Sequence, residues 1–111
     1  MPKKSIEISV GSVFIVPGYK DRTDIVINTG EKNWFFSSLC KIEGDGFSII
    51  GSPGTTGPEN ILKVIKQFPI EMVKMRMIKY WEEMIGSPLD KDLLATIDEE
   101  ICGKPRRISL E

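Results

Sequence analysis

Short apolar runs separated by turn residues fill the first half of the chain. Runs of this kind, rich in β-branched residues and bounded by Gly, Pro, Asn and Asp, are typical of β-strands joined by tight turns. The connections are too short for crossovers, so neighbouring strands are expected to be antiparallel. The pattern predicts a sheet over about residues 5–51 with the strands SIEISV (5–10), VFIV (13–16), IVIN (25–28), WFFSSLCKI (34–42) and FSII (47–50).

Two of these strands are apolar at consecutive positions, namely VFIV and the start of WFFSSLCKI. Successive side chains of a strand point to opposite faces, so one buried face cannot accommodate them all. We expect either that helices cover one side while the sheet curls into a small barrel, or that one face meets a partner chain. The string GSVFIVPG (11–18), the strand with Trp34 and the five short runs resemble small SH3-like barrels, a resemblance that implies no function and no site residue.

Helical periodicity replaces alternation in the second half of the chain. PENILKVIKQF (58–68) places five apolar residues on one helical face and ends before Pro69, and TGPE (56–59) matches a capping box. The longest periodic segment, residues 70–85, ends at Gly86. A third helix is predicted to begin with Ser87 as N-cap and Pro88 in its first turn, and to end near Gly103.

These patterns predict an α+β fold in which an N-terminal antiparallel β-meander or small SH3-like barrel is followed by three α-helices packed on it. We expect one domain over residues 1–111, with a linker at 51–57, a helical half at about 58–102 and a basic tail at 103–111. The length of 111 residues, with 41% hydrophobic and 28% charged residues, is that of an ordinary globular domain.

The segment FSIIGSPGTTGPEN (47–60) has the order strand, glycine-rich loop, helix start that is typical of phosphate-binding loops. A nucleotide-binding loop of this type needs Lys followed by Ser or Thr after its last glycine, and here Pro58 and Glu59 occupy those positions. A carboxylate there would repel phosphate. The sequence therefore favours a structural role for this segment.

Candidate catalytic chemistry is sparse. The chain has no histidine, which removes Ser-His and Cys-His pairs and the commonest zinc ligand. Cys40 and Cys102 match no metal-ligand spacing, and Cys40 lies in a strand pattern expected to be buried. We expect a protein that is not an enzyme and needs no cofactor or metal, with an enzyme using Cys40 or a carboxylate pair as a remote alternative.

A protein-interaction surface is the function that the pattern favours. Met72 and Met75 fall outside the apolar arc of the helix 70–85, on the side that carries Arg76 and Lys79. Exposed methionine is adaptable contact surface, and a charged rim is common around interfaces. The sequence predicts a small interaction or regulatory module that uses these four residues to bind a protein partner or a second copy of itself.

Nucleic-acid binding is the alternative function. The overall net charge of −1 argues against a surface committed to nucleic acid. However, basic residues gather in the stretch 63–79 and in the tail, and they could contact phosphates. The candidates are Lys63, Lys66, Arg76, Lys79, Arg106 and Arg107.

Acidic residues gather in the segment that follows, where residues 80–101 contain seven acids and one lysine. No segment has the features of a signal peptide or an apolar run long enough to span a bilayer. A cytoplasmic location without membrane contact is the expectation.

Overall fold

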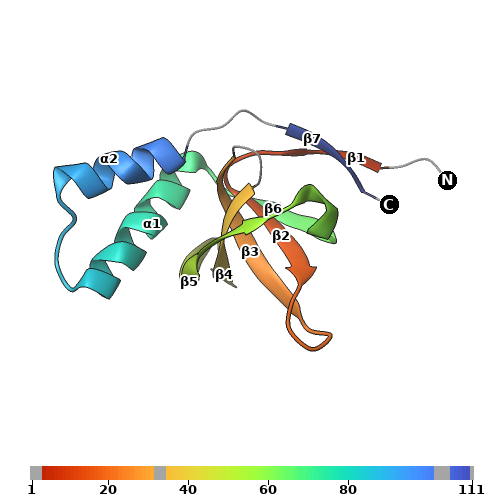
Figure 1. The fold of residues 1–111 in the computed structure, drawn as a ribbon, viewed down its shortest axis with the longest axis horizontal. Helices are drawn as coiled ribbons and strands as arrows, with labels where there is room; N and C mark the ends of the chain where they lie inside the picture. The colour runs from red at the N-terminus through yellow and green to blue at the C-terminus, as the bar shows by residue number, and fades with distance from the viewer. Residues whose placement is uncertain (1–3, 32–34, 102–105, 111) are drawn as a thin grey trace.

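The computed structural model describes residues 4–31, 35–101 and 106–110. Within these residues the elements follow in chain order: β1 (Lys4–Ile8), β2 (Ser12–Pro17), β3 (Thr23–Glu31), β4 (Phe35–Glu43), β5 (Gly46–Thr56), the short 3₁₀ turn η1 (Pro58–Asn60), β6 (Lys63–Gln67), α1 (Ile70–Ile85), α2 (Lys91–Glu100) and β7 (Arg106–Leu110). The fold is α+β, as predicted, with the helices at one end of the molecule (Figure 1).

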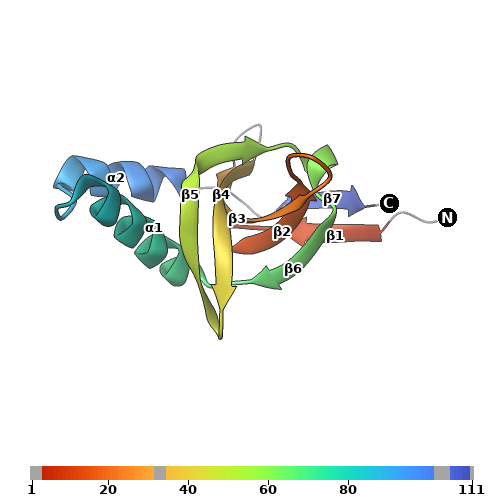
Figure 2. The same ribbon diagram turned by 90° about the horizontal axis from the view of Figure 1, so that it is seen from below.

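Five strands form the main sheet, in the order β5-β4-β3-β2-β6, and every neighbouring pair is antiparallel. The antiparallel meander β2-β3-β4-β5 was predicted. The closed SH3-like barrel was wrong, because the sheet is curled but open and its edge strands β5 and β6 do not pair (Figure 2). Register shifts in three of the strand pairs bend the sheet locally.

Both faces of the curled sheet are buried near its centre, which explains the consecutive apolar residues of β2 and β4. Val13 and Ile27 belong to a cluster with Val73, Met77 and Ile97 of the helices. A second cluster lies on the other face of the sheet. It contains the last residue of β1, residues of β2, β3 and β4, and the residue that follows η1, namely Ile8, Phe14, Val16, Val26, Phe35 and Ile61. Because successive side chains of a strand point to opposite faces, the same strands contribute residues to two small cores.

The helix predicted over residues 58–68 is wrong. Only Pro58–Asn60 turn, as η1, and Lys63–Gln67 form the edge strand β6, which pairs with β2. The run is short and rich in β-branched residues, so its apolar positions fit a strand as well as a helix. Hydrogen bonds to the open edge of β2 decide between the two.

The residues predicted as a linker, 51–57, and as a capping box are also placed differently. Up to Thr56 they extend β5, which pairs with β4 along its length. The hydroxyl of Thr56 is buried and shares a 2.8 Å hydrogen bond with the hydroxyl of Ser37. Thr56 therefore joins two strands and does not cap a helix.

Helix α1 has the bounds predicted from its periodicity, and α2 begins later than predicted. Gly86 ends α1 in the left-handed conformation with a φ of 83°. The Oδ1 of Asp90 accepts a 2.9 Å hydrogen bond from the backbone N–H of Leu93, so Asp90 is the N-cap in place of Ser87. Two α-helices, and not three, occur in the described residues.

The segment predicted as a basic tail contains a strand. β7 pairs antiparallel with β1 in a separate two-stranded ribbon, with Ile8 opposite Arg106 and Glu7 opposite Arg107. The ribbon lies at the end of the molecule away from the α1–α2 hairpin (Figure 1).

Candidate functional site

Helix α1 organises the candidate sites because it lies between α2 and the edge strand β5 (Figure 2). Val73 and Met77 are buried on its inner side and attach it to the sheet. Burial of side chains of this size stabilises a fold by about 1.5–3 kcal/mol each. The two flanks of α1 remain available, one toward α2 and one toward β5.

The four residues predicted as an interaction surface lie on the β5 flank and the outer side of α1. Met75 is 67% exposed. Met72 is partly buried and packs beside the turn between β4 and β5, where a Cβ on Gly46 would lie 3.9 Å from its sulfur. Arg76 and Lys79 line a cleft between α1 and β5. Arg76 and Lys79 thus share the cleft, while Met75 is exposed on the same helix and does not line it.

That cleft has a volume of about 90 Å³ and is lined by polar groups of both elements. Its lining consists of Ser48, Ile49, Arg76, Lys79, Tyr80 and Glu83. The hydroxyl of Ser48 donates a 3.0 Å hydrogen bond to the carboxylate of Glu43. The cleft thus combines two cations, two hydroxyl groups and one carboxylate.

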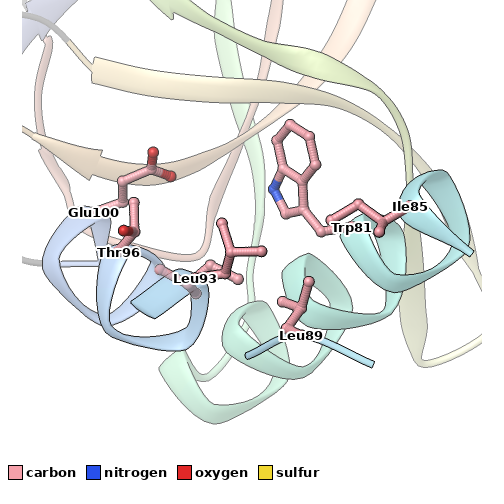
Figure 3. A pocket seen from close by; sticks show the side chains of 7 residues that line it. Trp81, Ile85, Leu89, Leu93, Thr96 and Glu100 are labelled. Atoms are coloured by element: carbon pink, nitrogen blue, oxygen red, sulfur yellow. The ribbon is translucent and has the colours of Figure 1, made fainter. Parts of the chain in front are cut away.

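A second hollow, the α1–α2 pocket, lies on the other flank of α1 (Figure 3). Its volume is about 130 Å³ and its lining is mostly apolar: Trp81, Ile85, Leu89, Leu93, Thr96, Ile97 and Glu100. Ile85 is 51% exposed and Leu93 is 41% exposed, so the pocket opens to the surface. The sequence did not predict this pocket.

The end of α2, which carries the lining residue Glu100, packs closely on β3. The backbone carbonyl of Glu100 approaches Gly30 so closely that a Cβ there would lie 1.8 Å from the carbonyl oxygen. Burial raises the pKa of the Glu100 carboxyl above its ordinary value. An acidic group in a half-buried apolar setting favours a ligand that brings a positive charge or a hydrogen-bond donor.

Several acids of residues 80–101 have structural roles. Glu82 accepts a hydrogen bond from the backbone of Leu89, Asp90 caps α2, and Asp98 forms a salt bridge with Lys74 that joins the two helices. Asp92 and Glu99 are exposed within one turn of Thr96. The surface of α2 near Thr96 therefore carries exposed negative charge.

Four of the residues predicted for nucleic-acid binding belong to β6 and α1. Lys63 and Lys66 lie on β6, and Arg76 and Lys79 lie on α1 beside β5. Arg106 and Arg107 are positions of β7 in the terminal ribbon. The fold distributes these candidates over three elements.

The strand cysteine is a core residue. Cys40 is 4% exposed, and burial raises the pKa of its thiol to about 11. A thiol with that pKa is protonated near neutral pH and is a poor nucleophile. Among the described residues no group of three or more His, Cys, Asp and Glu side chains is placed to hold a metal ion.

Within the part of the chain that the structure describes, no helix is long and apolar enough to cross a membrane. Comparisons with protein-family models, with curated proteins and with solved structures found no match to this chain.

Proposed function

We propose that the protein is a non-enzymatic interaction module that binds a segment of a partner protein at the α1–α2 pocket. The observation that carries the proposal is an open apolar pocket between two helices that has a half-buried acid, Glu100, in its wall. A large apolar side chain of the partner would fill the pocket. The proposed function is the interaction function expected from the sequence. The proposed binding site lies on the flank of α1 that faces α2, and not at Met72 and Met75.

The size of the pocket suits one side chain. Sites for drug-sized ligands and cofactors usually have about 300–1,000 Å³, whereas an apolar cavity of about 150 Å³ accepts a molecule as small as benzene. The 130 Å³ of the α1–α2 pocket lies near the lower value. Anchor side chains that fill such pockets supply much of the binding energy at protein interfaces.

The charge around the pocket defines the partner further. Glu100 lines it, and Asp92 and Glu99 are exposed on α2 beside it. A partner segment with Lys or Arg next to its apolar anchor would meet these carboxylates. Charge complementarity of this kind contributes mainly specificity and association rate. The partner segment is therefore expected to be basic and amphipathic.

Selection from a random peptide display library tests the proposal. Enriched peptides are expected to share a large apolar residue flanked by Lys or Arg. The variant Thr96→Phe should abolish their binding, because Thr96 lines the pocket and a phenylalanine there would fill it. The side chain of Thr96 is exposed, so the larger residue should not disturb the hydrophobic core. Ala95→Phe is the matched control, since Ala95 is exposed on the same helix and does not line the pocket.

Two results would contradict this proposal. One is an enriched peptide class that binds Thr96→Phe as tightly as the parent. The other is loss of binding in Met75→Lys together with full binding in Thr96→Phe, which would place the partner on the outer side of α1. Sedimentation of the parent and of Thr96→Phe tests self-association: a dimer that dissociates in Thr96→Phe would identify a second copy as the occupant.

The interaction function is preferred over nucleic-acid binding because of the charge distribution. The described basic candidates are divided between β6, the β5 side of α1 and β7, while the helical hairpin is acidic. Nucleic-acid binding draws most of its affinity from several phosphate contacts on one continuous surface. The cleft with Arg76 and Lys79 is better suited to a single anionic group.

A further inference from the structure

The cleft between α1 and β5 is separate from the α1–α2 pocket. Its helical residues Arg76, Lys79 and Glu83 lie on the β5 flank, whereas Trp81 and Ile85 lie on the flank toward α2. Tyr80 lines the cleft and contacts the ring of Trp81 edge-on, at 5.4 Å between centroids. A ligand in the cleft would therefore occupy a different surface from the partner segment.

Arg76 is incompletely satisfied in this cleft. Its Nε atom is shielded from solvent and has no hydrogen-bond partner among the described residues. Its Nη2 atom reaches the turn between β4 and β5, where a Cβ on Gly46 would lie 3.8 Å away. A buried donor without an acceptor is rare in folded proteins, and a donor on a charged group is especially costly to leave unpaired. Because Nε is shielded, an acceptor in the cleft would reach it only if the guanidinium group shifts toward the cleft.

The charges of the cleft favour an anion. Arg76 and Lys79 are three residues apart on α1, and neither forms an ion pair with another described residue. Glu83 is the one carboxylate in the lining, so the lining keeps an excess of positive charge. The hydroxyl of Tyr80 adds a neutral donor, while that of Ser48 already donates to Glu43.

The available volume and the donors point to one tetrahedral oxyanion. A cleft of about 90 Å³ has room for a few water molecules, at about 30 Å³ each, or for one group of similar size. Arginine presents a planar fork that matches phosphate oxygens, and lysine supplies a point charge. We propose that the cleft between α1 and β5 binds a phosphoryl group, held by Arg76 and Lys79.

A phosphoryl group fits the two cations better than a carboxylate does. A phosphate monoester carries about 1.5 to 2 negative charges and three acceptor oxygens at pH 7, enough for the guanidinium, the ammonium and a hydroxyl together. A carboxylate offers two oxygens and one charge, which Arg76 alone would satisfy. Free phosphate and a phosphorylated side chain present the same chemistry, and the experiment separates them.

The test is a titration of the full chain, followed by NMR of the backbone amides, with inorganic phosphate, with blocked O-phosphoserine and with acetate. Phosphate or phosphoserine should give saturable shifts confined to the neighbourhood of residues 48–49 and 76–83. Acetate should bind more weakly than both. At least tenfold tighter binding of phosphoserine would identify a phosphorylated side chain as the source, and equal affinities would identify free phosphate.

Three substitutions probe the mechanism. Arg76→Gln should weaken phosphate binding by about tenfold or more, the effect of losing one charge-assisted hydrogen bond. Lys79→Gln should weaken it by about threefold, and Glu83→Gln should strengthen it by about threefold, because exposed charges contribute less. Lys91→Gln, a cation of α2 outside the cleft, is the matched control and should leave binding unchanged.

Lys79 and Glu83 are exposed, so their variants are expected to fold even if Arg76→Gln does not. Shifts that do not saturate, or that spread over lysines and arginines throughout the chain, would overturn the proposal. So would equal phosphate affinity in the parent, Lys79→Gln and Glu83→Gln. Acetate binding as tight as phosphate binding would overturn the assignment to a phosphoryl group.

Discussion

The close approach of α2 to β3 gives the sharpest test of this fold. In Gly30→Ala the new Cβ would lie 1.8 Å from the carbonyl oxygen of Glu100, and the carbon of that carbonyl would be 3.0 Å away. Both are backbone atoms and cannot rotate aside as the end of a side chain would. The end of α2 must therefore move away from the sheet, which disturbs Ile97 in the core and the walls of the α1–α2 pocket.

The size of the effect follows from the contacts that are disturbed. Inserting a methyl group into a well-packed region costs about 1–3 kcal/mol. Undocking of the helix end would also expose Ile97, whose burial is worth about 1.5–3 kcal/mol. We expect the free energy of unfolding to fall by about 2–4 kcal/mol, the sum of a partial loss of both contributions.

Urea unfolding followed by tryptophan fluorescence measures this loss. Gly54→Ala is the matched control, because Gly54 is also a strand glycine and a Cβ there would contact nothing within 4 Å. Its free energy of unfolding should stay within about 0.5 kcal/mol of the parent. Equal stability of Gly30→Ala and Gly54→Ala would refute the proposed docking of α2 on β3.

Two further predictions concern titrating groups. Because burial raises the pKa of Glu100, the stability that its protonated form contributes is lost as pH rises above the ordinary pKa of about 4.3. Glu100→Gln should therefore melt at a higher temperature than the parent at pH 7 and at the same temperature at low pH. The exposed variant Glu99→Gln should show no such pH dependence. Burial likewise raises the pKa of Cys40 to about 11. The stability that the buried, protonated thiol gives to the folded state should therefore be lost as pH rises from about 8.5 toward that value. In a Cys102→Ser background, iodoacetamide at pH 8 should modify Cys40 only as fast as the native structure opens, and rapid alkylation under native conditions would contradict a buried thiol.

The sequence predicted the strands of the meander because their signals are local. β2, β3 and β4 combine β-branched or aromatic residues with turn residues at both ends, and no competing pattern exists. Helix α1 was equally clear, since its apolar positions repeat with helical spacing over 16 residues and Gly86 ends it. Where apolar residues repeat with a single period over a long segment, the secondary structure that this period favours is also the one that packs in the fold.

Prediction failed where the outcome depended on distant partners. Residues 63–67 fit two periods, and the open edge of β2 selected the strand. The ribbon of β1 and β7 joins residues about 100 positions apart, and nothing in the local pattern of the basic tail signals that pairing. The 51–57 segment was read as a loop from its glycines, although β4 is long enough to pair with it.

The residue pattern predicts the bounds of α1 but not the two hollows that lie on either flank of it. Trp81 and Ile85 belong to the periodic segment 70–85, and apolar side chains at helical spacing usually face the core. Val73 and Met77 are buried against the sheet, Trp81 is only partly buried against the same cluster, and α2 is held against β3 by the contact at Gly30. Ile85 and Leu93 remain exposed and line the pocket between the two helices. Whether such side chains are buried depends on how the two helices dock on the sheet and on each other, and the local residue pattern does not encode that docking.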